Sequence, residues 1–271
     1  MPSKFLFSQF QKQLIGSLGL DGDEVEILPL QLFLAETFGS EGGTQIFEEI
    51  TSDISFFRSQ DPASALYSDA EILSVRRGVA AIAAHRIFSA ILKVFPESLY
   101  SVEVMAKYIQ KDTNIEIHPT AKIKVPFAID HGHGTVIGAT AEVGEEVFLY
   151  HGVTLGASGK RDEAERRHPI LGNRVFCGNA SQILGPSVIE DGVSLASGSI
   201  VVNSYVEEGV KIFLSVRVSG VIIPAGTTVY AGDPENIRRY WVLLKNQTQP
   251  AWHIFEPFVS HKGVSIKTPE K

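Results

Sequence analysis

The sequence contains only one cysteine, Cys177, among 271 residues. A disulfide within the chain is therefore excluded, which fits a reducing compartment. No run of about 18 apolar residues occurs, so we expect no membrane span. The first 26 residues have no long uncharged apolar core and no clear small-residue cleavage site. We therefore expect no signal peptide and a location in the cytoplasm.

Positive charge is also in short supply. Lysine and arginine number 24 against 31 aspartates and glutamates, a formal net charge of −7. This balance argues against nucleic acid or an anionic membrane as the main partner. The length suits one large domain or two modest ones.

Residues 1–112 have helical patterns and predict a small α-helical domain. The clearest helix covers 68–95, where Ser68 and Glu71 have the spacing of a capping box and a broad apolar face follows. Weaker helical patterns cover 28–38, 44–57 and 101–111.

Beyond residue 113 apolar residues recur every six positions, an interval that suits neither a helix nor an ordinary strand. The series is Ile117, Ile123, Ile129, Ile137, Val143, Leu149 and Leu155, then Leu171, Cys177, Ile183, Ile189, Leu195 and Val201. Four residues after each member of the second run stand Val175, Ser181, Ser187, Val193, Ser199 and Tyr205, most of them small or β-branched. Such a period predicts a parallel β-helix in which three six-residue units make one triangular coil. The apolar residue, including Cys177, points inward.

The period is interrupted at places where a solenoid commonly carries its function. Two extra residues fall within "DHGHG", and a polar insertion covers 157–170. Segment 206–229 is expected to add a further coil or a hairpin. After Pro234 the chain looks helix-like, with Trp241 and Trp252 in this stretch. We therefore expect a β-helix over 113–236 and a C-terminal tail over 237–271, an α+β fold in all.

Several segments carry a resemblance to a known family. They are "SQDPASALYSDAEILSVRRGVAAIAAHR", "IEIHPTAKI", "IDHGHGTVIGATAEVG", "LYHGVTLGASGK", "RRHPIL" and "AGDPENIRR". In order and spacing the sequence resembles the serine O-acetyltransferases, a hexapeptide-repeat family. The resemblance implies a left-handed β-helix and acetyl-CoA as donor, with no metal. It also implies a homotrimer, or a dimer of trimers, with active sites between neighbouring subunits.

The resemblance also implies roles for individual residues. The catalytic histidine falls on His131, and its acidic partner, an aspartate in the family, falls on Glu116. The positions that bind the acceptor fall on Asp61, Asp130, Arg167 and His168. The positions that contact the coenzyme fall on Gly156, Ala157, Gly159, Lys160, Ala180, Ala196 and Ser197.

These residue types suit the chemistry of acetyl transfer. A neutral imidazole can remove the proton of a hydroxyl group, and a carboxylate beside it stabilises the imidazolium that forms. The backbone N–H groups of a glycine-rich turn such as "LGASG" can hold the oxyanion. Carboxylates suit the ammonium group of an amino-acid acceptor, and Arg167 with His168 suits its carboxylate.

Three functions stay open at this point. The leading hypothesis is acetylation of L-serine for cysteine synthesis. Departures such as Glu116 and "GASG" leave homoserine or another hydroxy amino acid as a second acceptor. The third hypothesis is a zinc-dependent carbonic anhydrase, because His133 and His151 are 18 residues apart, one full coil, and could stack on one wall. No third ligand at a suitable spacing is evident.

The C-terminus bears on one partner. Family members that bind cysteine synthase do so through a flexible tail that ends in isoleucine. This sequence ends Thr268, Pro269, Glu270 and Lys271, a polar terminus. We therefore expect no stable cysteine synthase complex.

Overall fold

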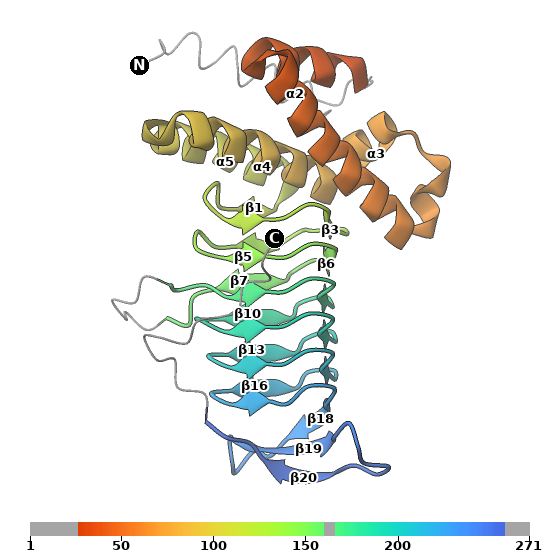
Figure 1. The fold of residues 1–271 in the computed structure, drawn as a ribbon, viewed down its shortest axis with the longest axis vertical. Helices are drawn as coiled ribbons and strands as arrows, with labels where there is room; N and C mark the ends of the chain where they lie inside the picture. Colours follow the sequence, from red (N-terminus) through yellow and green to blue (C-terminus); the bar gives the residue numbers. More distant parts are fainter. Residues whose placement is uncertain (1–26, 160–165, 258–271) are drawn as a thin grey trace.

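A computed structural model describes residues 27–159 and 166–257 of the chain. The helices precede the solenoid and cover its first coils (Figure 1). They are α2 (Ile27–Gln60), η1 (Pro62–Leu66), α3 (Asp69–Val75), α4 (Arg77–Val94), η2 (Pro96–Ser98) and α5 (Leu99–Thr113). Helix α2 is interrupted at Gly39, which has φ 77°. Among the described residues, no helix combines the length and the apolarity needed to cross a membrane.

The helix expected over 68–95 is two helices. The capping box is confirmed, because Ser68 accepts from the backbone of Glu71 while the Glu71 side chain accepts from Ser68. The break is at Arg76, whose backbone is extended. This conformation directs the guanidinium to Asp61 at 2.9 Å and to the Ser64 hydroxyl at 3.1 Å. A polar contact outside the helix therefore ends α3 where the apolar pattern alone continues.

The solenoid consists of short strands on three sheets, which we call A, B and C. Sheet A contains β1 (Glu116–Ile117), β4 (Val136–Ile137), β7 (Thr154–Gly156), β10 (Gln182–Leu184), β13 (Ile200–Val202) and β16 (Arg217–Ser219). Sheet B contains β2 (Lys122–Ile123), β5 (Glu142–Val143), β8 (Ile170–Leu171), β11 (Val188–Ile189), β14 (Tyr205–Val206) and β17 (Ile222–Ile223). Sheet C contains β3 (Phe127–Ile129), β6 (Val147–Leu149), β9 (Phe176–Cys177), β12 (Ser194–Leu195), β15 (Lys211–Ile212), β18 (Thr228–Gly232), β19 (Arg239–Leu243) and β20 (Ala251–Ile254).

The chain visits the three sheets in turn, and each strand up to β18 pairs in parallel with the strand one coil away. The molecule is a left-handed parallel β-helix of about six turns behind an N-terminal helical region, as the period predicts. Segment 206–229 continues the parallel coils, the first of the two forms that we expect for it.

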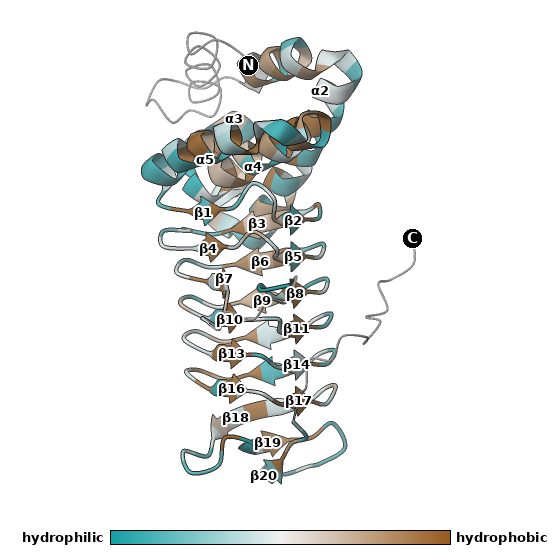
Figure 2. Cartoon of the chain, turned by 90° about the vertical axis from the view of Figure 1, so that its left-hand side faces the viewer, coloured by the Kyte–Doolittle hydropathy of each residue, from teal (hydrophilic) through white to brown (hydrophobic). Residues whose placement is uncertain are grey.

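The hexapeptide register is confirmed by burial. Every member of the apolar series is buried except Ile123, which is half-buried. In Figure 2 the strands of sheet A show brown, the colour of apolar residues. The small residues fit the corners because their hydroxyls fold back onto the backbone: Ser187 Oγ donates to Leu184 O at 2.8 Å and Ser199 Oγ to Ala196 O at 2.7 Å. At the next corner this position belongs to buried Ser204, and Tyr205 lies half-buried instead.

The expectation of a helix-like tail after Pro234 is wrong, because this stretch forms a β-hairpin. Strand β19 pairs antiparallel with β18 on one side and with β20 on the other, which extends sheet C. Tyr240 and Val242 are buried while their neighbours in β19 are more exposed, a period of two that a strand requires. Tyr240 and Phe255 stack at 5.8 Å over the end of the prism. The chain then crosses to sheet B, where Ile222 N donates to Glu256 O.

Candidate functional site

The two extra residues of the "DHGHG" segment project from the corner between sheets C and A. Gly152 N donates to His133 O, and Ala180 N donates to His151 O one coil later. His133 therefore keeps the regular register, and the added pair is His131 and Gly132. Both have left-handed backbones, with φ 57° and 77°. Such a backbone is uncommon at a residue other than glycine and is often found at functional sites. The His131 side chain is 61% exposed.

Two carboxylates lie beside His131. Asp130 Oδ1 accepts from the backbone N–H of His131 at 2.8 Å, and its Oδ2 lies 3.7 Å from His131 Nε2. Asp61 comes from the helical region, between α2 and η1. Its pKa is lowered, chiefly by the Ser64 hydroxyl that donates to it, and further by Arg76 and by the nearby His131. One chain therefore gathers Asp61, Asp130 and His131 at a single corner.

Helix α4 contacts this corner through a glycine. A Cβ built on Gly78 would lie 2.0 Å from the carbonyl oxygen of Ile129, the residue before Asp130. Only a residue without a side chain allows the helix to approach β3 so closely. The helical region thus supports the backbone that carries Asp130 and His131.

Glu116 lies apart from His131 in this conformation. It is exposed on β1, and its Oε2 accepts from Gln110 Nε2 of α5 at 2.9 Å. Within the described residues it makes no hydrogen bond or ion pair to His131. Its role as the partner of His131 stays a prediction.

Arg167 and His168 occupy another corner, between sheets A and B. His168 Nδ1 accepts from the backbone of Thr140 at 3.3 Å and lies 2.8 Å from the Thr140 hydroxyl. Its ring packs on Gly138, where a Cβ would come within 2.1 Å of the imidazole. Burial lowers the pKa of His168, and Arg167 lowers it further. Sheet A separates these two residues from His131 of the same chain.

A groove of about 390 Å³ begins at His131 and follows the corner between sheets C and A. It is lined by His131, Tyr150, His151, Phe176, Gly178, Asn179, Ala196, Ser197 and Leu214. Two of the residues predicted to contact the coenzyme, Ala196 and Ser197, are among them, and Ala180 directly follows Asn179. The lining residues belong to successive coils, so a ligand whose reactive end is at His131 would extend along this corner.

The other predicted coenzyme residues are elsewhere. Gly156 ends β7 on sheet A, and Ala157 and Gly159 follow it at the start of the polar insertion. Lys160 lies outside the described residues. Cys177, expected in the core, is fully buried, and burial raises the pKa of its thiol to about 12, so it is no nucleophile at neutral pH.

Two histidines lie behind His131, and the sequence gives them a role only in the zinc hypothesis. His133 and His151 stack face to face, with ring centroids 4.6 Å apart and an interplanar angle of 16°. Their spacing of one full coil could predict this stack, but not that His151 lines the groove. Among the residues described, no group of three or more His, Cys, Asp or Glu side chains is arranged to hold a metal ion.

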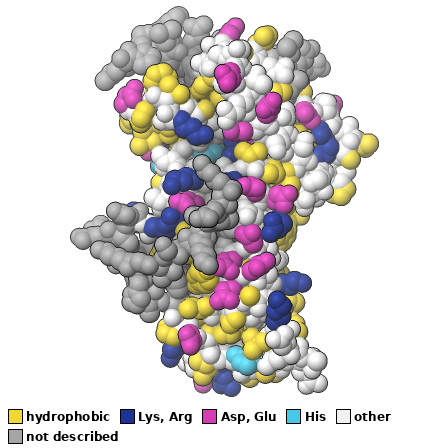
Figure 3. Space-filling model, viewed as in Figure 1, with side chains coloured by type: hydrophobic (Ala, Val, Ile, Leu, Met, Phe, Trp, Pro, Cys, Tyr) yellow, Lys and Arg dark blue, Asp and Glu magenta, His cyan; other side chains and the backbone are white. Residues whose placement is uncertain are grey.

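The surface charge is mixed. Figure 3 shows acidic and basic side chains interspersed on the face seen in Figure 1. Pairs such as Lys122 with Glu142 at 3.1 Å and Lys124 with Glu145 at 3.5 Å join neighbouring coils.

Comparisons with known proteins agree on one family. The chain is 35% identical to a serine acetyltransferase of Bacillus licheniformis over 161 residues, which are 59% of this chain and 72% of the relative. It is 39% identical to a serine acetyltransferase of Helicobacter pylori over 145 residues, 53% of this chain and 81% of the relative. No protein-family model matches the chain.

Solved structures give the same result. The crystal structure of Neisseria gonorrhoeae serine acetyltransferase superposes with a TM-score of 0.60 at 28% identity, covering 84% of this chain and 80% of that one. The structure of the same enzyme in complex with serine has a TM-score of 0.60 at 26% identity, covering 84% and 82%.

Proposed function

This chain belongs to the serine acetyltransferase family and is an acyltransferase, and from that premise we propose that it transfers the acetyl group of acetyl-CoA to the hydroxyl of L-serine. The product is O-acetylserine, which serves cysteine synthesis. One observation carries the proposal: exposed His131 lies with Asp130 at the end of a groove that extends over the later coils to Leu214. The structure of a relative in complex with serine supports serine as the acceptor.

In the proposed reaction, neutral His131 takes the proton of the serine hydroxyl as its oxygen attacks the thioester carbon. A positioned general base is typically worth about 10²–10⁴ in rate. A carboxylate beside the ring stabilises the imidazolium, and Asp130 is the one within 3.7 Å in this conformation. Glu116 is the partner that the family resemblance implies. Collapse of the intermediate breaks the C–S bond and returns the proton to sulfur.

We propose that the acceptor site is completed by a second copy of the chain. Asp61 and Asp130 suit the ammonium group of serine, whereas Arg167 and His168, which suit its carboxylate, lie at a different corner. A homotrimer would place the corner between sheets A and B of one copy beside the corner between sheets C and A of the next. The groove would then hold acetyl-CoA between two copies, in the cytoplasm. Arg167, His168 and the "GASG" turn would act from the neighbour.

The test measures release of free CoA from acetyl-CoA with serine, homoserine, threonine or an amino sugar. We expect release only with a hydroxy amino acid, and fastest with serine. His131→Ala should lower kcat by about 10²–10⁴ while calorimetry shows that CoA still binds. His253→Ala, on β20 and outside the residues that line the groove, is the matched control and should retain full turnover. Activity on the sugar but on no amino acid would refute the proposal.

A further inference from the structure

His151 lies between two other histidines at the mouth of the groove. Its ring stacks on His133 at 4.6 Å and meets the ring of His131 at 5.8 Å, with the two planes at 77°. His133 occupies the equivalent position in the preceding coil, so the distance between the two rings is close to the spacing of neighbouring strands, about 4.8 Å. His151 is therefore held in place by His133 on one side, and its ring is nearly perpendicular to the ring of His131.

One nitrogen of His151 is available to a ligand. Its Nδ1 is buried and has no hydrogen-bond partner in the described part of the chain, so Nε2 is the nitrogen that reaches the groove. Burial lowers the pKa of His151, and so do His133 and His131, which favours a neutral ring with one proton. A buried N–H without an acceptor is rarer in proteins than an unsatisfied acceptor. The proton therefore belongs on Nε2, which points a donor into the groove.

We propose that His151 is a catalytic residue, whose Nε2–H donates a hydrogen bond to the carbonyl oxygen of the bound thioester. The inference rests on the proposed acetyl transfer. The "GASG" turn follows β7 on sheet A and would reach this groove only from a neighbouring copy. His151, in contrast, lines the same groove as His131. An acyl carbon about 3 Å from both groups would be in reach of the base and of the donor.

The bond changes assign His151 a single task. The serine oxygen forms a bond to the acyl carbon as His131 accepts the hydroxyl proton. The π electrons of the carbonyl move onto its oxygen, and the resulting oxyanion accepts a stronger hydrogen bond from His151 Nε2 than the neutral carbonyl does. When the oxyanion re-forms the carbonyl, the C–S bond breaks and the proton of His131 passes to sulfur. His151 keeps its proton throughout.

His133 is a positioning residue in this scheme. It is not among the residues that line the groove, but its ring backs His151 and fixes the plane of that imidazole. A flat ring without a nitrogen should serve equally well. His133→Phe should therefore preserve most of the turnover that His133→Ala loses.

The experiment compares kcat for serine acetylation in wild type, His151→Ala and His151→Gln. Loss of one oxyanion donor typically costs about 10²–10³ in kcat, so we expect a fall of that order in the alanine variant. The glutamine amide places an N–H near the position of Nε2 and should recover at least about tenfold. Free CoA has no thioester carbonyl, so its Kd should change by less than about threefold in either variant.

Each other outcome overturns the inference. A His151→Ala enzyme with kcat within about threefold of wild type would show that no such donor acts. Equal losses in the alanine and glutamine variants would show that the shape of the ring matters, not its donor. If wild type acetylates no hydroxy amino acid, the proposed function fails and this inference fails with it. A wild type that is active on serine confines any failure to His151.

Discussion

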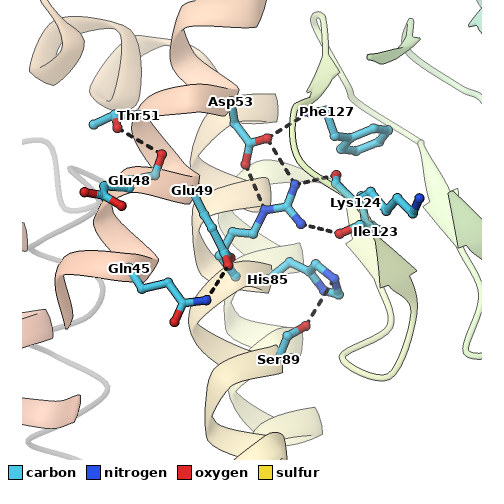
Figure 4. A network of polar contacts seen from close by, with 11 residues as sticks. Gln45, Glu48, Glu49, Thr51, Asp53, His85, Ser89, Ile123, Lys124 and Phe127 are labelled. Carbon is cyan, nitrogen blue, oxygen red and sulfur yellow. Dashed lines mark hydrogen bonds and ion pairs between the residues drawn. The ribbon is translucent and has the colours of Figure 1, made fainter. Parts of the chain in front are cut away.

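Arg86 of α4 and Asp53 of α2 form a buried, two-pronged ion pair, with Nε to Oδ2 at 2.9 Å and Nη2 to Oδ1 at 3.0 Å. The pair also reaches the first coil (Figure 4). Asp53 Oδ1 accepts from the backbone of Phe127 at 2.8 Å, and Arg86 donates to the carbonyls of Ile123 and Lys124. Both charges are thus satisfied, and one cluster joins two helices to the solenoid.

Removal of one partner of this pair should be costly. Asp53→Ala leaves a buried guanidinium without its counter-charge, so we expect the free energy of unfolding to fall by about 3–5 kcal/mol. Denaturation in urea measures it. Lys122→Ala, which removes an exposed partner of Glu142, is the control and should change the free energy by less than about 1 kcal/mol. Similar effects in the two variants would contradict the assignment.

Buried His85 should make the protein sensitive to acid. Burial lowers the pKa of its imidazole to about 3, and Arg86 contributes. Below an unfolded pKa of about 6.5 the unfolded chain binds a proton that the folded chain excludes. This contribution to stability is complete above pH 6.5 and falls by about 1.4 kcal/mol per pH unit as the pH drops toward 3.

The check is the free energy of unfolding between pH 7.5 and 4.5 in wild type and His85→Gln. Glutamine binds no proton in this range, so the free energy of unfolding of the variant should fall less steeply with decreasing pH. The difference between the two slopes should correspond to about one proton taken up on unfolding. Parallel curves for the two proteins would show that His85 does not titrate on unfolding.

Gly78→Ala tests the contact between α4 and the corner that carries His131. The new Cβ would overlap Ile129 O, so the helix must move away from β3. Overpacking of this kind typically costs about 1–3 kcal/mol, and we expect turnover to fall as well, because Asp130 directly follows Ile129. Gly42→Ala in α2 is the control, since its Cβ would meet only Phe38 Cβ at 3.3 Å. If Gly78→Ala turns over normally, the helix does not position the corner.

Asp130→Asn and Glu116→Gln should separate the two candidate partners of His131. We expect the first to lower kcat more at saturating serine, because Asp130 lies 3.7 Å from the ring while Glu116 is bonded to Gln110. Gln110→Ala frees Glu116 and should leave kcat unchanged if Glu116 plays no part. A larger loss in Glu116→Gln would show that Glu116 reaches His131 during turnover.

The sequence predicts the solenoid well because its register repeats locally. Each buried residue, such as Ile183 or Leu195, marks one strand of the solenoid in the sequence itself. The 18-residue spacing of His133 and His151 likewise predicts that their rings stack. The break at Arg76 depends on a distant carboxylate, Asp61, which a helical pattern cannot reveal. The hairpin was mistaken for a helix because the alternating stretch in β19 is short.

The site was less accessible from sequence for a related reason. The six-residue period does not say which corner of the prism a turn occupies. That position depends on which two of the three sheets the turn connects. His131 lies at the first break in the period and His168 lies within the polar insertion, the second break, and sheet A separates the two in space. The exposed position of His131 comes from two added residues, which the sequence does indicate as a break in the period.

The hairpin that closes the last coil limits how copies of the chain can associate. A stack of parallel strands with a bare end is a template onto which another chain can add, which leads to open-ended fibres. Here Tyr240 and Phe255 stack over the last coil, and the antiparallel strand β19 occupies the edge of β18 on sheet C. On sheet B, the backbone carbonyl of Glu256 accepts the N–H of Ile222. Helices cover the opposite end. Among the described residues, both ends of the solenoid are thus covered, so the coils of one copy do not offer a bare end onto which the coils of another could add to build an open-ended fibre.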